Sequence, residues 1–448
     1  MKASLLAAMV AVAGVGTGAC SSSSTNPAIA DGGAGVLLSS VDGGRSARVV
    51  PPPLPFAPAN ITWTSAVDIG GVQDEDVSTT CVLRTENAGA QSCFSSHAVQ
   101  FVTTMADRSA LHVIVVKSLH VESTGHMTFD NGGIPLAIVS LGDMTISGTI
   151  NASNTQPTRG PGRGPDGTST AGKPGIGAGG GSYCGRGGQG GQDEAAAVQP
   201  GAPAAAYGSA ALSPLLPGSS GGTGTAGAAG GGAIELVAGG TFTMDPGSAI
   251  FANGGAATPA MVTGRDGDGG GSGGAILIEA VTVSIAGSLS ANGGDGGHGI
   301  GSARNSASPS PGINSTAPAP ADDARAPVDA MAPDGTQGDA MAPPPVMDAT
   351  LPGPTGLPIM TQATGFPGGG AGSSGTAIDG SAGGSAAAGG ASGGGGGGAG
   401  RIRIDAMSEP PTLTEATLSP ALGSDPTAGC TTVGAPSPSV QRMQTSST

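Results

Sequence analysis

Large and basic side chains are scarce in this sequence. Its 448 residues include 7 Phe, 2 Tyr and 1 Trp, and only 16 are Lys or Arg. Because aromatic and long aliphatic side chains supply most of the apolar area that a globular core buries, a thick core is excluded. The net charge of -15 and the lack of a basic stripe exclude a surface for phosphate backbones, so we expect no nucleic-acid partner.

Long apolar runs are also missing, except near the N-terminus. Lys2 precedes an apolar run from Leu5 to Val15, and small residues occupy positions 16–19. This three-part pattern is typical of a secretory signal, so we expect residues 1–19 to be a signal peptide. Beyond it, no apolar run reaches the about 20 residues that a membrane-spanning helix needs.

The first cysteine follows this segment directly. Thr17-Gly18-Ala19-Cys20 resembles the lipobox of bacterial lipoproteins, although that family has Leu or a similar apolar residue where this chain has Thr17. The resemblance implies a lipid on Cys20, attachment to the outer membrane or cell surface, and a flexible tether over residues 20–60. The same residues also fit an ordinary small-x-small cleavage site, which leaves simple secretion as the alternative.

Only four further cysteines are present. They are Cys81, Cys93, Cys184 and Cys430. An even number in an oxidising compartment predicts two disulfides, for which three connectivities exist. Cys81 and Cys93 flank a turn-like segment at 87–89, so a hairpin closed by a local bridge is the simplest pairing, and it leaves Cys184 for Cys430. No CxxC or His/Cys spacing is present, so we expect no metal site.

Glycine is abundant, with 86 residues, and it separates short apolar repeats. Residues 144–152 match residues 283–291 position for position, and looser copies run over 119–133 and 242–255. Each copy alternates apolar and polar residues over a few positions and then breaks at Gly or Asn-Gly. This pattern predicts short strands that end in turns.

The spacing of these strands predicts that they stack. Val121 and Ile146 are 25 residues apart, which is about the length of one solenoid coil. Ile234 and Ile276 are 42 residues apart, which fits one coil plus a glycine-rich excursion. We therefore expect an all-β parallel solenoid in which the matched apolar positions point into a narrow shared core.

Three glycine-rich stretches lie between the expected strands, at residues 157–231, 254–273 and 365–400. They fit either flexible linkers or extended segments packed side by side in polyproline II conformation, because only glycine permits such close approach of backbones. Residues 302–364 are rich in Pro, Ala and Asp and lack periodicity, so we expect a disordered insertion there.

The chain is therefore expected to have one structured body. This body occupies residues 61–301 and carries the first two glycine-rich stretches as loops. After the insertion, residues 365–406 add a third loop and the final solenoid strand, and residues 407–448 form a C-terminal tail.

The repeats also resemble those of a known family. The resemblance lies in residues 207–222, 273–280, 289–294 and 396–404. These segments resemble the glycine-rich lipoproteins of myxobacteria and their relatives, over residues 60–300 and 365–406. The resemblance implies a right-handed parallel β-helix of the pectin-lyase-like type and an envelope location. It implies no activity, because the family has no established one.

Candidate catalytic and metal-binding residues are few. Asp130, Asp143 and Asp245 lie at expected strand ends or turns, where Asp commonly caps backbone groups. Short Gly/Asp turns at 266–270 and 293–298 match calcium-binding turns only in part. The histidines have no common ligand spacing; they are His97, His112, His120, His126 and His298.

We therefore expect no catalytic residue and no cofactor. The pattern favours a non-catalytic structural or adhesive protein that presents a glycine-rich solenoid to polysaccharide or to other envelope proteins. A carbohydrate-active enzyme, a lyase or hydrolase on the same scaffold, is the alternative, and it requires several charged side chains that converge in one groove. Arg401 and Arg403 alternate with Ile402 and Ile404, so we expect both arginines to face water.

Overall fold

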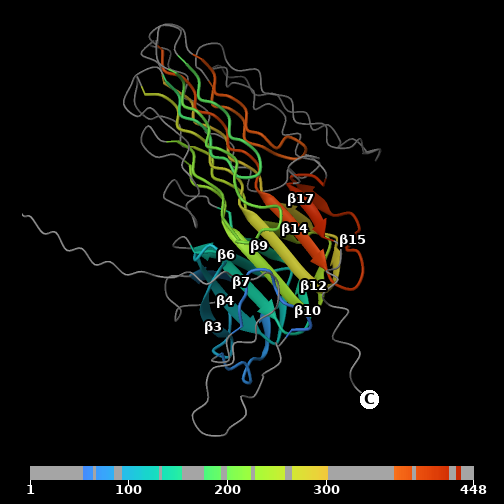
Figure 1. Ribbon diagram of the computed structural model, residues 1–448. Coiled ribbons are helices and arrows are strands. Elements are labelled where there is room, and N and C mark those ends of the chain that lie inside the picture. The colour runs from blue at the N-terminus through green and yellow to red at the C-terminus, as the bar shows by residue number, and fades with distance from the viewer. Residues whose placement is uncertain are drawn as a thin grey trace, which may run out of the picture. The chain divides into compact units, whose positions relative to one another are not determined.

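The structure is a computed structural model (Figure 1). It describes residues 54–63, 67–84, 93–130, 134–153, 176–192, 199–222, 228–257, 265–300, 368–385, 390–422 and 430–434. Within these residues all regular secondary structure is β-strand, so the fold is all-β. The expected signal peptide, Cys20 and the expected insertion at 302–364 lie outside the described residues.

The strands fall into three series, and within each series successive strands pair in parallel. The first series comprises β4 (Ala110–Val116), β7 (Leu136–Ser140), the start of β10 (Ala233–Met244), the start of β12 (Ala275–Ile285), β14 (Arg401–Ala406) and β17 (Thr431–Gly434). The second comprises β1 (Asp74–Val77), β5 (Ser118–Val121), β8 (Met144–Ile146), the ends of β10 and β12, and β15 (Thr412–Leu413). The third comprises β2 (Thr80–Arg84), β6 (His126–Asp130), β9 (Thr149–Asn151), β11 (Ala249–Phe251), β13 (Ser288–Ser290) and β16 (Thr417–Ser419).

These series form two sheets. Because β10 and β12 each run through the first two series, those series belong to one 11-stranded sheet, and the third series is a six-stranded sheet. The one antiparallel pair among the named strands joins β3 (Val99–Thr104) to β4.

The register confirms the stacking expected from sequence spacing. Val121 pairs with Ile146, and Ile234 pairs with Ile276. The matching repeats also occupy equivalent places, because Ile146 pairs with Met244 and Met244 pairs with Ile285. The spacings of 25 and 42 residues are therefore the distances along the chain between paired strands.

The larger of two hydrophobic clusters contains side chains from all three series. Ile146, Ile150, Ile285 and Leu289 all belong to it and are fully buried. The strands that contribute to this cluster do so with alternate side chains, which is why the sequence repeats apolar residues with a period of two.

The first series is buried on its other face as well. There Val113, Val237 and Leu277 pack against Phe56 and Leu212, which come from segments 54–63 and 207–216. A strand covered on both faces has few positions for polar side chains, and this explains the nearly continuous apolar runs at the starts of β10 and β12.

The structured body extends beyond the expected boundaries at both ends. Leu54 and Phe56, assigned to the tether, are buried on the sheet. Residues 407–434, assigned to the tail, contain β15, β16 and β17, so β14 is not the last strand. Residues 412–419 lack the glycine that interrupts the repeats at 144–152 and 283–291, and no such repeat covers β17, so these strands were not predicted.

The long glycine-rich excursions begin and end at equivalent points of the fold. Each leaves a strand of the third series and returns to a strand of the first: residues 152–232 join β9 to β10, 252–274 join β11 to β12, and 291–400 join β13 to β14. In Figure 1 their described parts run side by side as long segments without strand arrows.

Candidate functional sites in the glycine-rich layer and on the sheet

The described parts of these excursions form what we call the glycine-rich layer. It consists of residues 176–192, 199–222, 228–232, 252–257, 265–274, 291–300, 368–385 and 390–400. Backbone hydrogen bonds join its segments, and along residues 393–400 these bonds repeat every three residues. The N–H groups of Gly393, Gly396 and Ala399 donate in turn to the carbonyls of Gly384, Ser381 and Ile378, at 2.9, 2.9 and 2.7 Å.

The other N–H groups of this segment serve two further neighbours. Gly394, Gly397 and Gly400 donate to Gly297, Gly294 and Ala291, and Gly395 and Gly398 donate to Ala178 and Gly181. Successive N–H groups thus donate to three different neighbouring segments, and the same neighbour recurs at every third residue. A helix with three residues per turn, which is the geometry of polyproline II, produces this pattern. The side-by-side packing is thus confirmed for the described residues, and the flexible-linker interpretation is wrong for them.

This packing depends on the absence of side chains. A Cβ atom added to Gly397 would overlap the carbonyl oxygen of Gly271, which is backbone and cannot rotate away. The segments are therefore held at a separation that only glycine permits.

Three serine side chains form hydrogen bonds inside the layer. Ser182, Ser219 and Ser272 are fully buried. The Oγ of Ser219 accepts a hydrogen bond from the Ser182 N–H, and the Oγ of Ser272 accepts one from the Ser219 N–H, both at 2.8 Å. The Ser182 Oγ donates to the Ala204 carbonyl at 2.6 Å. These hydroxyls add to the backbone hydrogen bonds between the segments, such as the one that the Ser272 N–H donates to the Ser219 carbonyl at 3.0 Å.

The candidate calcium-binding aspartates have structural partners. Asp266 accepts a hydrogen bond from the Ser392 N–H at 2.9 Å, and Asp295 accepts one from the Gly372 N–H at 2.6 Å. Each carboxylate therefore caps a neighbouring segment. In the part of the chain that the structure describes, no group of three or more His, Cys, Asp or Glu side chains is arranged to hold a metal ion.

The other aspartates and histidines singled out from the sequence do not form one site. Asp143 accepts a hydrogen bond from the Thr241 N–H at 2.7 Å, and Asp245 accepts one from the Ser147 hydroxyl. Asp143 therefore caps a backbone group, as expected, whereas the partner of the Asp245 carboxylate is a side-chain hydroxyl. The remaining candidates are spread over β4, β5, β6 and the loops; they are His97, His112, His120, His126, His298 and Asp130.

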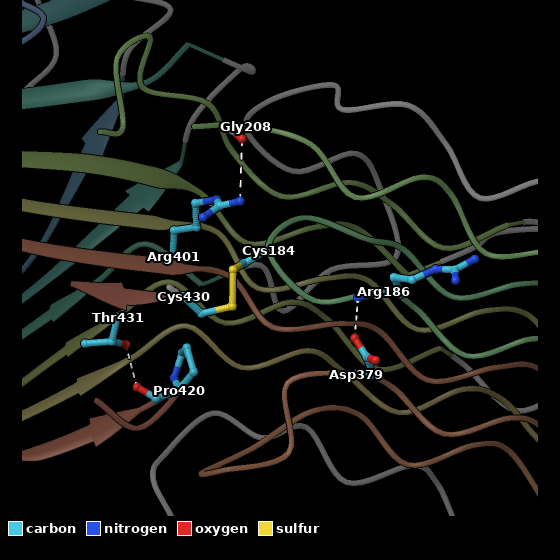
Figure 2. The surroundings of a disulfide bond; sticks show 8 residues. All are labelled: Cys184, Arg186, Gly208, Asp379, Arg401, Pro420, Cys430 and Thr431. Atoms are coloured by element: carbon cyan, nitrogen blue, oxygen red, sulfur yellow. Dashed lines mark hydrogen bonds between the residues drawn. A yellow bond between two sulfur atoms is a disulfide. The ribbon is translucent and has the colours of Figure 1, made fainter. Parts of the chain in front are cut away.

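Two disulfides with the simplest expected pairing are present. Cys81 is bonded to Cys93, with Cα atoms 5.1 Å apart, and Cys184 to Cys430, with Cα atoms 5.6 Å apart. The expected turn at 87–89 lies outside the described residues. Within the described residues, β2, which contains Cys81, pairs in parallel with β6 and not in an antiparallel hairpin. Figure 2 shows that the second bond ties the glycine-rich layer, through Cys184, to the residue that precedes β17.

Contacts around this disulfide join the layer to the strands. The Arg186 N–H donates to Asp379 Oδ1 at 2.7 Å, which links two segments of the layer (Figure 2). Arg401 of β14 points to the carbonyl of Gly208, at 3.5 Å, and its guanidinium carbon lies 5.8 Å from the centre of the Tyr183 ring. Arg401 is buried, so the expectation that it faces water is wrong.

A cluster of carboxyl groups lies on the same covered face of the first series. Glu235 of β10, Glu279 of β12 and Asp405 of β14 are 0%, 3% and 8% exposed. Glu279 is the register partner of Asp405. Burial raises the pKa of Glu279, and the charge of Glu235 raises it further, against a smaller opposing effect from the hydrogen bond that the Ala59 N–H donates. Burial also raises the pKa of Glu235, against a smaller opposing effect from hydrogen bonding to Glu279 and Asn60.

This cluster was not predicted from the sequence, although a signal exists. Glu235 and Glu279 interrupt runs that are otherwise apolar, Ala-Ile-Glu-Leu-Val-Ala and Ala-Ile-Leu-Ile-Glu-Ala. A carboxyl group in a strand that is buried on both faces has no access to water, so its pKa must shift. Burial on the second face comes from residues 54–63 and 207–216, which are distant in sequence.

The chemistry available to this cluster is limited by its cover. Two carboxyl groups of raised pKa could act as acid and base on a substrate. Here Glu235 is fully buried and Glu279 nearly so, under segments 54–63 and 207–216. The charged side chains thus converge, but they lie under a covering segment and not in an open groove.

Among the described residues, no helix is long and apolar enough to cross a membrane. Comparison with protein-family models, with curated proteins and with solved structures finds no match to this chain.

Proposed function

We propose that this chain is a non-catalytic structural or adhesive protein of the cell surface or extracellular matrix, which presents a rigid glycine-rich layer to polysaccharide or to envelope proteins. The observation that carries the proposal is the hydrogen-bonded array with a three-residue period. Glycine-rich chains are ordinarily flexible, and a binding surface made from them would lose much entropy on binding. An array whose N–H groups are already paired avoids most of that loss.

In this proposal the three series of strands form a right-handed parallel β-helix that supports the layer. Parallel pairing of successive repeats and one core shared by all three series support this architecture. Successive coils would then place the start and the end of each glycine-rich excursion beside those of the next one. This arrangement agrees with the equivalent points at which the excursions leave the third series and return to the first.

The layer offers a regular surface to a ligand. Along one segment Arg186, Gln189 and Gln192 recur at every third position, and the first two are exposed. Polyproline II rises about 3.1 Å per residue, so such side chains recur about every 9 Å. A regular row of hydrogen-bonding groups suits an extended polymer with its own repeat. The net charge of -15 favours a neutral polysaccharide over a polyanion.

A glycan array tests this proposal on soluble protein that lacks residues 1–20. We expect binding to one or more neutral polysaccharides and its loss in R186A/Q189A. Gln73→Ala, an exposed glutamine outside the layer, is the matched control and should bind as the parent does. Binding that survives R186A/Q189A unchanged, or no binding to any polysaccharide, contradicts the proposed surface.

The alternative enzyme is tested on the same panel. The observation that favours it is the convergence of Glu235, Glu279 and Asp405 on one sheet face. Release of reducing or unsaturated ends from a bound polysaccharide, abolished by Glu279→Gln, would replace the adhesive proposal with a lyase or hydrolase.

The location is proposed from the N-terminal sequence. The signal-like residues 1–19 and the lipobox-like residues 17–20 support a lipid on Cys20 that holds the protein to the outer membrane or cell surface. The resemblance to glycine-rich lipoproteins of myxobacteria supports the same location. Radiolabelled palmitate should mark the intact chain and should not mark Cys20→Ala. Label that persists in this variant would favour simple secretion.

A further inference from the structure

Segment 54–63 is held on the sheet by one charged contact and several neutral ones. The Ala59 N–H lies 3.1 and 3.2 Å from the two carboxylate oxygens of Glu279 and donates to them. The Asn60 amide donates to the Leu212 carbonyl at 2.9 Å, and the Ser213 hydroxyl donates to the Ala59 carbonyl at 3.3 Å. Apolar contacts come from side chains of the segment that belong to the second hydrophobic cluster; they are Leu54, Phe56 and Ile61.

Glu279 does not lie alone beneath this segment. Glu235, on the neighbouring strand, is fully buried and interacts with it directly. Glu279 and Asn60 are polar neighbours of the Glu235 carboxylate, but no hydrogen bond of good geometry reaches either of its oxygens. Asp405, the register partner of Glu279, adds a third carboxyl group to the same face.

The groups that face the pair provide little compensating positive charge. On β14, Arg403 is bound to Asp405 at 2.7 Å, and Arg401 packs against Tyr183. The covering segments 54–63 and 207–216 contain no Asp, Glu, Lys, Arg or His. Their one ionisable side chain is the phenol of Tyr207, which donates to the Pro217 carbonyl.

The strands on the other side of β10 add no charge to this face. Ala137 of β7 is the register partner of Glu235, and Val113 of β4 is the register partner of Ala137. His112 of β4 lies one position along from Val113, so its side chain points to the opposite face of the sheet.

Two adjacent carboxyl groups in such a place cannot both ionise at low cost. Like charges at short range and exclusion from water each favour the protonated form, so the pair titrates as a unit that retains a proton. An uncovered pair would regain water and ionise near the ordinary glutamate pKa of about 4.3. Removal of the last proton therefore favours the state in which the cover has left.

We propose that Glu235 and Glu279 form a pH-sensitive latch, which holds residues 54–63 on the sheet while the pair keeps a proton and releases them when both groups ionise. The sign follows from proton linkage. The docked state binds more protons than the released state, so docking is strongest below the ordinary glutamate pKa and weakens as pH rises through the raised pKa of the pair.

Release would change the reach of the N-terminal part of the chain. Residues 54–63 lie between Cys20 and the strands, so their release would add their extended length, about 3.3 Å per residue, to the tether. This consequence rests on the proposed lipid anchor. The latch itself does not, and its test uses neither lipid nor glycan.

Hydrogen exchange read by mass spectrometry tests the latch on the full chain. Protection of residues 54–63 is measured from about pH 4 to about pH 8 and corrected for intrinsic exchange rates. We expect protection to fall up to about tenfold per pH unit for each proton released. The fluorescence of Trp63, the only tryptophan of the chain, should shift over the same range.

The variant E235Q/E279Q separates the latch from general pH effects. Glutamine keeps the shape and the acceptor oxygen for the Ala59 N–H but does not titrate, so protection of 54–63 should become independent of pH. Asp76→Asn removes a carboxyl group whose side chain is 68% exposed, and it should behave as the parent chain does. Protection that does not change with pH in the parent chain overturns the proposal, whether or not the variants fold. An unchanged pH dependence in folded E235Q/E279Q overturns it as well.

Discussion

The stacked strands and the glycine-rich layer both hold extended chains side by side, but different interactions stabilise them. Both consist of extended chains joined by backbone hydrogen bonds. In the strands, alternate side chains such as Ile146 and Ile285 fill a shared core, so buried apolar area supplies the stability. In the layer, close contacts between glycine backbones leave little room for side chains, and each segment uses its N–H groups on up to three neighbours. Stability there depends on close backbone contact and on complete hydrogen bonding.

This comparison predicts opposite tolerance to substitution. The strands should accept changes among apolar residues and reject charge, because their interior requires apolar volume. The layer should reject even a methyl group at glycines that touch the backbone of another segment, because no space for a Cβ exists there.

Ile285→Asp should abolish the cooperative fold. Ile285 is fully buried in the core that all three series share, and an unpaired carboxylate there costs several kcal/mol, about the whole stability of many domains. Circular dichroism should show loss of the β signal. Ser284→Asp, one position along on the other face, should leave the signal nearly unchanged. Equal damage from the two variants would contradict the alternation by which the core was assigned.

Replacing Cys184 and Cys430 by Ser should cost more than replacing Cys81 and Cys93. The Cys184–Cys430 bond closes a separation of 246 residues and joins the layer to the strands. The Cys81–Cys93 bond closes a separation of only 12 residues. On the loop-entropy model, the two bonds stabilise the folded protein by about 5 and about 3 kcal/mol, because each lowers the entropy of the unfolded chain. Urea unfolding of both double variants measures the two losses. An equal or reversed order would show that the layer and the strands do not unfold as one unit.

Gly397→Ala should destabilise the protein by about 3 kcal/mol, because its Cβ would overlap the backbone of Gly271. Gly71→Ala is the matched control, since an added Cβ at Gly71 meets no atom within 4 Å. It should change the free energy of unfolding by less than about 0.5 kcal/mol. Similar effects at both glycines in urea unfolding would show that the layer is not closely packed.

Ser219→Ala should have the smallest effect of the four, a loss of about 1 to 2 kcal/mol. It removes the hydroxyl that accepts the Ser182 N–H and donates to the Ser182 carbonyl, and it leaves both backbone groups buried without this partner. Hydrogen exchange at residue 182 should quicken. Exchange at Ile285 should stay as in the parent chain, because the strand core does not use this hydroxyl. Faster exchange at both places would remove the distinction between the two regions.

The strand pairing could be predicted from the sequence because its signal is local. Val121 and Ile146, like Ile234 and Ile276, stand at spacings that a stacked repeat requires, and the structure pairs them. The even number of cysteines, with one close pair, likewise led to the two disulfides that are present. Each of these inferences needs only neighbouring residues and a repeat length.

Tertiary structure alone decided the partners inside the layer and the chemistry of the sheet face. The glycine-rich segments are nearly alike in composition, so nothing local tells Gly394 to pair with Gly297 and Gly395 with Ala178; the strands that carry the segments fix this choice. Glu235 is a single polar residue in an otherwise apolar run, and it is buried because a segment about 180 residues earlier in the chain covers its face of the sheet. Periodicity along a strand shows which side chains share a face, but whether that face meets water depends on distant segments, and so does the pKa of each carboxyl group on it.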